Sequence, residues 1–244
     1  MAYKFNFLKN DAKYSGISDE TVTFFVEKAL CETSAWRKFV NQFREQRDGE
    51  NKGWRGEYFG KTLRGAVLIY EYSRSEKLYN TLVDAVEDML TVIERDGRVS
   101  TYSRETEFKG WDIWSRKYVI LSLLYFIDIC KDEELKARIT SFISRCTDYI
   151  IMHIGDEEGK TPITAATSHW CGLNSSSILE PIVKLYNLTG EKRYFDFATY
   201  IVNSGATSVA NIFECAYENK VPPHLYGVSK AYEMISCFEG LLEY

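Results

Sequence analysis

The sequence predicts an all-α fold built from repeated helical hairpins, and three observations support this. The 244 residues include only 4 Pro and 15 Gly, so few positions interrupt a helix. Apolar residues recur at the i, i+3, i+4 spacing of an amphipathic helix along nearly the whole chain. Pairs of such segments, joined by short charged turns, return at an almost fixed interval, which is typical of a repeat architecture.

The composition excludes several classes of protein. Hydrophobic residues make up 45% and aromatic residues 15% of the chain, which indicates a folded rather than a disordered protein. The formal net charge of -5 argues against a nucleic-acid ligand. No apolar run approaches the roughly 18 residues of a membrane span, and the N-terminus lacks the apolar core of a secretory signal. We therefore expect a cytoplasmic protein that binds neither nucleic acid nor membrane.

The expected elements begin after an N-terminal extension, residues 1–17, and fill a single domain over residues 18–244. Charged turns with the sequences SRSE, KDEE and TGEK separate the two helices of three hairpins. The first apolar or aromatic residues after these turns, Leu78, Leu135 and Tyr194, are 57 and 59 residues apart. About nine helices are expected, two of them within 18–46 and the others near 61–73, 77–95, 112–130, 133–152, 175–188, 191–204 and 228–244.

A loop rich in glycine and aromatic residues precedes the first helix of each repeat. The four loops span residues 51–61, 108–118, 168–177 and 222–233. Because each leads into the same helix of a repeat, all four are expected at one end of the assembly, where a ring of hairpins has its cleft. An open α-solenoid is the alternative, but its turns are plain on both faces. Four of the five Trp lie in these loops, which favours an α/α toroid with a pocket.

The side chains in these loops indicate sugar binding. Apolar sugar faces stack on aromatic rings, while carboxylates and amides bind hydroxyls. Glycoside hydrolysis uses two facing carboxyl groups, and Glu57 and Asp112 are the expected catalytic pair. A salt bridge of Asp112 with Arg116 or Lys117 is the alternative. The expected substrate-binding residues are Trp54, Lys61, Trp111, Trp114, Arg116, His169, Trp170, Asn174, His224 and Tyr226, with Lys230 and Glu233 as further candidates.

The six cysteines show no spacing typical of a metal site or a disulfide framework, because none belongs to a CxxC pair. Cys31, Cys130 and Cys146 lie in apolar helical segments and are expected to be buried. Glu233 and Cys237 share a helix face at i, i+4 spacing and are a weak candidate for a metal pair. We expect no cofactor in this chain.

Four segments carry a resemblance to a known family: GWRGEYFGKTLRGA (53–66), DGRVSTYS (96–103), GWDIWSRKYVILSLLYF (110–126) and LNSSSILEPIVKLYNLTGEKRYFDFATYIV (173–202). From Phe43 to Glu243 the chain resembles the catalytic ring of the beta-L-arabinofuranosidase type enzymes, glycoside hydrolase family 127, and their bacterial relatives. The resemblance implies a six-hairpin glycosidase fold, an α/α toroid, and a hydrolase active in carbohydrate metabolism.

The sequence departs from this family inside the expected pocket. Where the resemblance implies histidines, the chain has Glu57, Lys61 and Arg116, and His224 is the one active-site histidine that matches. We therefore do not carry over the arabinofuranoside specificity, since Lys61 and Arg116 suit an acidic sugar or a different glycan. The family's zinc-binding cysteines and its acid/base glutamate lie further along than Tyr244. The resemblance thus implies zinc only in the family's C-terminal part, which follows the segment that matches this chain.

Nine helices supply about four and a half of six hairpins, so the expected ring is incomplete and truncated at its C-terminal end. The expected function is that of a glycoside hydrolase-like protein that hydrolyses or binds a glycan. The alternative is a non-catalytic helical module for carbohydrate binding or assembly that lacks the catalytic half. A third hypothesis is a partial ring that a second copy or a complementing chain completes, because an open edge exposes apolar helix surface.

Overall fold

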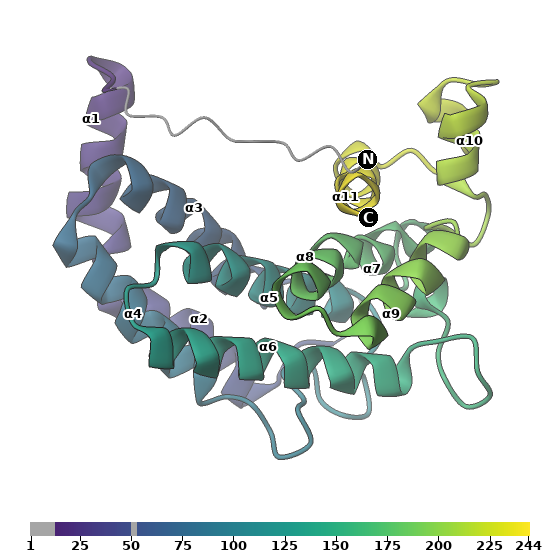
Figure 1. Ribbon diagram of the computed structural model, residues 1–244, viewed down its shortest axis with the longest axis horizontal. Coiled ribbons are helices and arrows are strands. Elements are labelled where there is room, and N and C mark those ends of the chain that lie inside the picture. The colour runs from purple at the N-terminus through teal and green to yellow at the C-terminus, as the bar shows by residue number, and fades with distance from the viewer. Residues whose placement is uncertain (1–12, 50–52) are drawn as a thin grey trace.

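The computed structural model describes residues 13–49 and 53–244, and its helices form two layers (Figure 1). A short π-helix, Phe25–Leu30, continues α1, and no β-strand occurs within the described ranges. The helices are α1 Ile17–Phe24, α2 Thr33–Glu45, α3 Glu57–Ser73, α4 Glu76–Leu90, α5 Asp112–Ile129, α6 Glu133–His153, α7 Leu173–Ser176, α8 Leu179–Thr189, α9 Lys192–Asn203, α10 Ile212–Glu218 and α11 Ala231–Glu243.

The expected helices are present, with differences at their ends. The helix expected over 175–188 is divided into α7 and α8, and α10 was not expected from the sequence. This short helix begins because the Asn211 side chain accepts hydrogen bonds from the backbone N–H groups of Phe213 and Glu214. Residues 1–12 of the expected extension lie outside the described residues, and α1 begins at its last residue, Ile17.

The turns inside the hairpins form for the local reasons that their sequences indicate. Ser75 Oγ accepts a hydrogen bond from the N–H of Leu78 at the start of α4. Asp132 Oδ1 does the same for Glu134 and Leu135 at the start of α6. Gly190 ends α8 at a φ of 70°, a left-handed conformation in which glycine carries no steric penalty. A side-chain cap or a glycine thus begins or ends a helix at each of these turns, and a long-range hydrogen bond from the Lys131 N–H to the Tyr79 hydroxyl adds to them at 2.8 Å.

The outer layer consists of α2, α4, α6 and α9, and ion pairs join its neighbouring helices. Arg44 of α2 contacts Asp88 of α4 at 2.6 Å, and Arg138 of α6 contacts Glu87 of α4 at 2.5 Å. The Arg193 guanidinium of α9 lies 2.8 Å from a carboxylate oxygen of Asp148 on α6. These pairs are partly exposed, so each contributes little to stability, about 0–1 kcal/mol. They show that α2 lies beside α4, α4 beside α6, and α6 beside α9.

The inner layer consists of α3, α5, α8 and α11, which pack in that order. Two glycines allow their backbones to approach closely. A Cβ atom at Gly60 of α3 would lie 2.2 Å from the carbonyl oxygen of Tyr118 on α5, and one at Gly240 of α11 would lie 2.7 Å from the backbone nitrogen of Glu180 on α8. Both close approaches bring the charged side chains of adjacent inner helices together.

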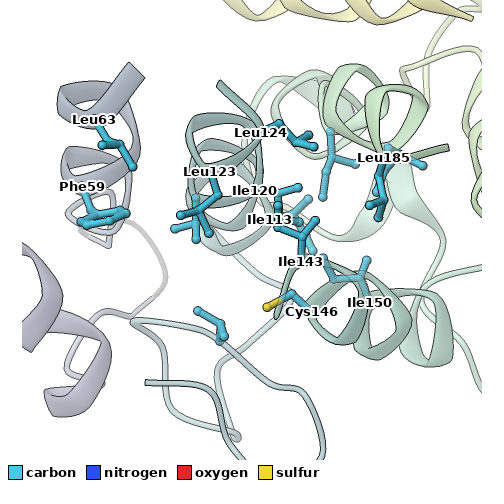
Figure 2. Packing of buried hydrophobic residues seen from close by; sticks show 14 of the residues in the cluster. Phe59, Leu63, Ile113, Ile120, Leu123, Leu124, Ile143, Cys146, Ile150 and Leu185 are labelled. Carbon is cyan, nitrogen blue, oxygen red and sulfur yellow. The ribbon is translucent and has the colours of Figure 1, made fainter. Parts of the chain in front are cut away.

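Helix α5 forms the centre of the hydrophobic core. Figure 2 shows its apolar side chains between Phe59 and Leu63 of α3 on one side and Ile143, Cys146 and Ile150 of α6 on the other. The helix is buried on nearly every side, as its apolar sequence requires. Burying one such aliphatic or aromatic side chain stabilises the fold by roughly 1.5–3 kcal/mol.

Successive hairpins in an inner and an outer layer make this an all-α fold of the α/α-toroid type, which confirms the fold class. The six cysteines are free thiols; Cys130 and Cys146 are buried as expected, whereas Cys31 is half-buried. Within residues 13–49 and 53–244, no helix combines the length and the apolar character needed to cross a membrane.

Candidate functional site

The loops that precede the inner helices meet at one end of the two layers, as their shared position in the repeat predicts. The rings of Trp111 and His169 lie 4.8 Å apart, although they come from different loops. Thr167 Oγ1 and Asn174 Nδ2 both donate hydrogen bonds to the carbonyl oxygen of Gly110, at 2.7 and 3.2 Å. We call the side chains gathered here the inner-end cluster, which consists of Trp54, Glu57, Tyr58, Lys61, Trp111, Trp114, Tyr118, His169, Trp170, Asn174, Lys230, Tyr232 and Glu233.

Glu57 is held in place by two donors at the start of α3. Its Oε2 accepts a hydrogen bond from the Trp114 indole N–H and lies 3.0 Å from the Lys61 ammonium. The Glu57 side chain is 15% exposed, so it still reaches the surface of the cluster. The indole N–H and the ammonium group both contact the same oxygen and so fix the orientation of the side chain. Glu57 therefore presents its carboxylate in a defined position at this end of the fold.

Lys61 lies in a cage of aromatic rings. Its Nζ is 5.3 Å from the ring centre of Trp114, 4.8 Å from that of Tyr118 and 5.2 Å from that of Tyr232. The Tyr118 and Tyr232 hydroxyls are 2.7 Å apart and so fix the two phenol rings relative to each other. Cation–π attraction together with the Glu57 carboxylate holds the ammonium between α3, α5 and α11.

Two tryptophans of the cluster are exposed and can offer a flat surface to a ligand. Trp54 is 42% exposed, and its indole N–H donates a hydrogen bond to the hydroxyl of the exposed Tyr58 at 3.1 Å. Trp170 is 43% exposed, and the Lys230 ammonium lies 5.3 Å from its ring centre. Large exposed rings with neighbouring hydrogen-bonding groups are suited to the apolar face and the hydroxyls of a sugar.

Several buried polar atoms in the cluster have no hydrogen-bond partner among the described residues. They are Glu233 Oε2, His169 Nε2 and Asn174 Oδ1. Burial disfavours the charged form of an ionisable group. It therefore raises the pKa of the Glu233 carboxyl and lowers the pKa of His169. Buried polar groups are almost always satisfied in proteins, so unpaired atoms in one region indicate a place for water or for a ligand.

Asp112, the expected partner of Glu57, lies in the core and not at the surface of the cluster. It has no exposed surface, and its oxygens accept hydrogen bonds from Ser100 Oγ, the Phe108 N–H and the Arg116 guanidinium. Arg116 is also buried and bonds Glu107 at 2.6 Å. The salt bridge with Arg116 that the sequence left open is therefore formed. Both residues are buried, so neither faces a cleft. Their opposite charges compensate each other inside the protein.

His224 and Tyr226 lie in the loop before α11. His224 belongs to the short 3₁₀ helix Pro223–Leu225 and is exposed, whereas Tyr226 is only 4% exposed. Tyr226 packs in the hydrophobic core, so a structural role accounts for its burial. Their part in substrate binding stays a prediction.

The sequence did not single out Tyr118, Tyr232 or the buried lysine of α5, Lys117, as parts of the site. Lys117 is 1% exposed, and burial lowers its pKa to about 8, although the Glu180 carboxylate acts in the opposite direction. Its ammonium lies 5.1 Å from the ring centre of Trp114. A lysine that directly precedes the long apolar run of α5 is the signal that could have revealed this position.

The chemistry of Glu233 and Cys237, the weak candidate for a metal pair, does not fit a metal site. Glu233 and Cys237 share a face of α11, but burial raises the pKa of the Cys237 thiol to about 12, and its Sγ lies 3.3 Å from the Leu173 carbonyl oxygen. A metal-binding cysteine must be a thiolate. In the part of the chain that the structure describes, no three His, Cys, Asp or Glu side chains are grouped as metal ligands.

A groove of about 480 Å³ lies away from the inner-end cluster, between α2 and α4 of the outer layer. None of the expected site residues lines it. Its lining residues are Thr33, Trp36, Arg37, Asn41, Arg44, Thr81, Asp84, Ala85 and Asp88.

An α/α toroid with aromatic rings and carboxylates at the mouth of its inner helices defines a glycoside hydrolase-like domain. The comparison with protein families agrees. Residues 12–236 match the model of the beta-L-arabinofuranosidase GH127 catalytic domain, and the chain belongs to this family. No curated protein matches the sequence.

A solved structure supports the same fold. The crystal structure of a GH127 beta-L-arabinofuranosidase from Geobacillus stearothermophilus superposes with a TM-score of 0.55 at 18% sequence identity. The alignment covers 85% of this chain and 33% of that enzyme's chain, so this chain spans about a third of the length of the enzyme. At this identity the likeness shows the shared fold.

Proposed function

We propose that the inner-end cluster binds a glycan and belongs to the substrate cleft of a glycoside hydrolase. The observation that carries this proposal is the fixed Glu57 carboxylate between the Trp114 indole and the Lys61 ammonium, next to the exposed ring of Trp54. The carboxylate can accept hydrogen bonds from sugar hydroxyls, and the ring can stack on the apolar sugar face. Family membership supports a carbohydrate as the ligand class.

The non-catalytic alternative rests on a different observation. Hydrolysis by a pair of carboxyl groups needs the second one across the scissile bond from Glu57, and Asp112 lies in the core with no exposed surface. A module that binds carbohydrate or assembles with a second copy or a complementing chain fits this arrangement. Turnover of aryl glycosides by the chain would favour hydrolysis, and sugar binding without turnover would favour a binding module. A mass that increases with concentration in analytical ultracentrifugation would favour assembly.

We expect Trp54→Ala to weaken sugar binding roughly tenfold, since a stacked aromatic ring contributes about 1–2 kcal/mol. Glu57→Gln is expected to weaken it by a similar factor, because the charged acceptor for hydroxyls is lost. Isothermal titration calorimetry with methyl β-L-arabinofuranoside and with digalacturonic acid measures both effects and separates neutral from acidic sugars.

The matched control is Tyr217→Ala on α10, since Tyr217 is an aromatic residue with 92% exposure outside the cluster. It is expected to leave the affinity unchanged. Equal affinities for native protein, Trp54→Ala and Glu57→Gln would contradict the proposed location of the cleft.

A further inference from the structure

We infer that Glu233 is a ligand-binding carboxylic acid of the inner-end cluster, which donates a hydrogen bond to an oxygen of the bound glycan in its protonated form. This inference rests on the proposed function and names a residue and a protonation state for it. Its consequence is glycan binding that weakens as the pH rises.

The position of Glu233 places it beside the ligand-facing groups. It lies in the first turn of α11, next to Tyr232, whose ring contacts the Lys61 ammonium and whose ring centre is 5.6 Å from that of Trp114. Lys61 in turn contacts Glu57 at 3.0 Å. Glu57 and Glu233 thus come from α3 and α11, and Lys61 and Glu57 are close enough to Glu233 to act electrostatically on its carboxyl.

The surroundings of Glu233 favour the neutral acid. The side chain is only 3% exposed, and its Oε2 has no hydrogen-bond partner among the described residues. Burial raises its pKa, the hydrogen bond from its own backbone N–H and the Lys230 and Lys61 ammonium groups lower it, and the Glu57 carboxylate raises it slightly. The net direction is upward, because burial is the largest of these effects.

A buried carboxyl group without a partner is costly unless something satisfies it. A protonated carboxyl carries one O–H donor, whereas the ionised Glu57 can only accept. Glycan hydroxyls and ring oxygens are acceptors for this donor. Glu57 and Glu233 would therefore recognise the glycan as an acceptor and a donor, respectively.

Deprotonation removes the donor and places a second anion next to Glu57. In the free protein the carboxyl loses its proton as the pH rises through its raised pKa, so affinity is lost in that direction. Above this pKa we expect the affinity to fall roughly tenfold per pH unit, which is the limit for binding that requires one proton. Burial lowers the pKa of His169, a second titratable group of the cluster, so a variant of Glu233 is needed to assign the pH dependence.

The test compares native protein with Glu233→Gln, in which the amide keeps a donor but cannot ionise. Affinities for methyl β-L-arabinofuranoside and digalacturonic acid are measured by calorimetry from pH 4 to about 8. We expect Glu233→Gln to bind as tightly at high pH as at low pH, while the native protein loses affinity. Glu239→Gln is the control on the exposed side of α11 and is expected to keep the native pH profile.

Each other outcome overturns the inference. Identical pH profiles for native protein and Glu233→Gln would assign the pH dependence to another group and leave the proposed function intact. A Glu233→Gln variant that stays folded but binds weakly at every pH would show that the ionised carboxylate is the acceptor. Absence of binding by either sugar at any pH would contradict the proposed function as well.

Discussion

Gly60→Ala is expected to destabilise the protein by about 3 kcal/mol, although alanine is the better helix former. The added Cβ would lie 2.2 Å from the Tyr118 carbonyl oxygen and 2.7 Å from the Tyr118 Cβ. Backbone atoms at these distances cannot rotate away, so α3 must move from α5. The contact lies one residue before Lys61, and the movement is also expected to open the aromatic cage.

Gly65→Ala is the matched control for this prediction. Gly65 lies in the same helix, is exposed, and has no atom within 4 Å of the position of an added Cβ. Without a steric cost, the higher helix propensity of alanine is expected to stabilise the protein by up to about 1 kcal/mol. Chemical denaturation measures both variants. A Gly60→Ala variant as stable as Gly65→Ala would show that α3 and α5 are less closely packed than the structure indicates.

Arg116→Met is expected to destabilise the protein by about 3–5 kcal/mol. The Arg116 guanidinium bonds Asp112 and Glu107, and all three side chains are almost fully buried. Methionine fills a similar volume between the Phe108 and Tyr149 rings but leaves the buried Asp112 carboxylate without its cation, whereas Glu107 keeps its ion pair with Arg98 at 2.8 Å. At this chain length the loss corresponds to a fall in melting temperature of roughly 10 °C.

The control for the buried network is Arg104→Met. Arg104 also pairs with two carboxylates, Glu94 at 2.5 Å and Asp96 at 2.9 Å, but its side chain is 50% exposed. Solvent screens these pairs, so the expected loss is below about 1 kcal/mol. Thermal unfolding followed by circular dichroism compares the two variants. Equal losses would contradict the burial that distinguishes the two sites.

The fold was predictable from the sequence because the signals that determine it are local. The apolar spacing of α4 and α6, the capping residues Ser75 and Asp132, and Gly190 each act within a few residues. Their repetition predicted hairpins in two layers. The short helix α10 was missed because seven residues carry too little periodic pattern to distinguish a helix from a loop.

The site was only partly predictable, because its geometry depends on packing between distant helices. The repeat correctly indicated that the loops of Trp111 and His169 meet. Asp112 is held in the core by Ser100 Oγ at 2.5 Å, the Phe108 N–H and the Arg116 guanidinium, and of these partners only Arg116 was considered from the sequence. The place of Glu233 likewise depends on how α11 packs on α8 at Gly240, which spacing alone does not reveal.

The most direct test of the proposed cleft is the response of the tryptophan indole N–H signals to sugar in a nitrogen–proton correlation spectrum. The chain has five Trp, and Trp36 serves as an internal reference. It is only 3% exposed, does not belong to the inner-end cluster and lines the groove between α2 and α4, and its N–H donates to the Leu30 carbonyl oxygen at 2.8 Å. We predict that digalacturonic acid or methyl β-L-arabinofuranoside shifts the signals of Trp54 and Trp170 and leaves Trp36 unchanged. Shifts confined to Trp36 would place the ligand in the outer groove and contradict the account.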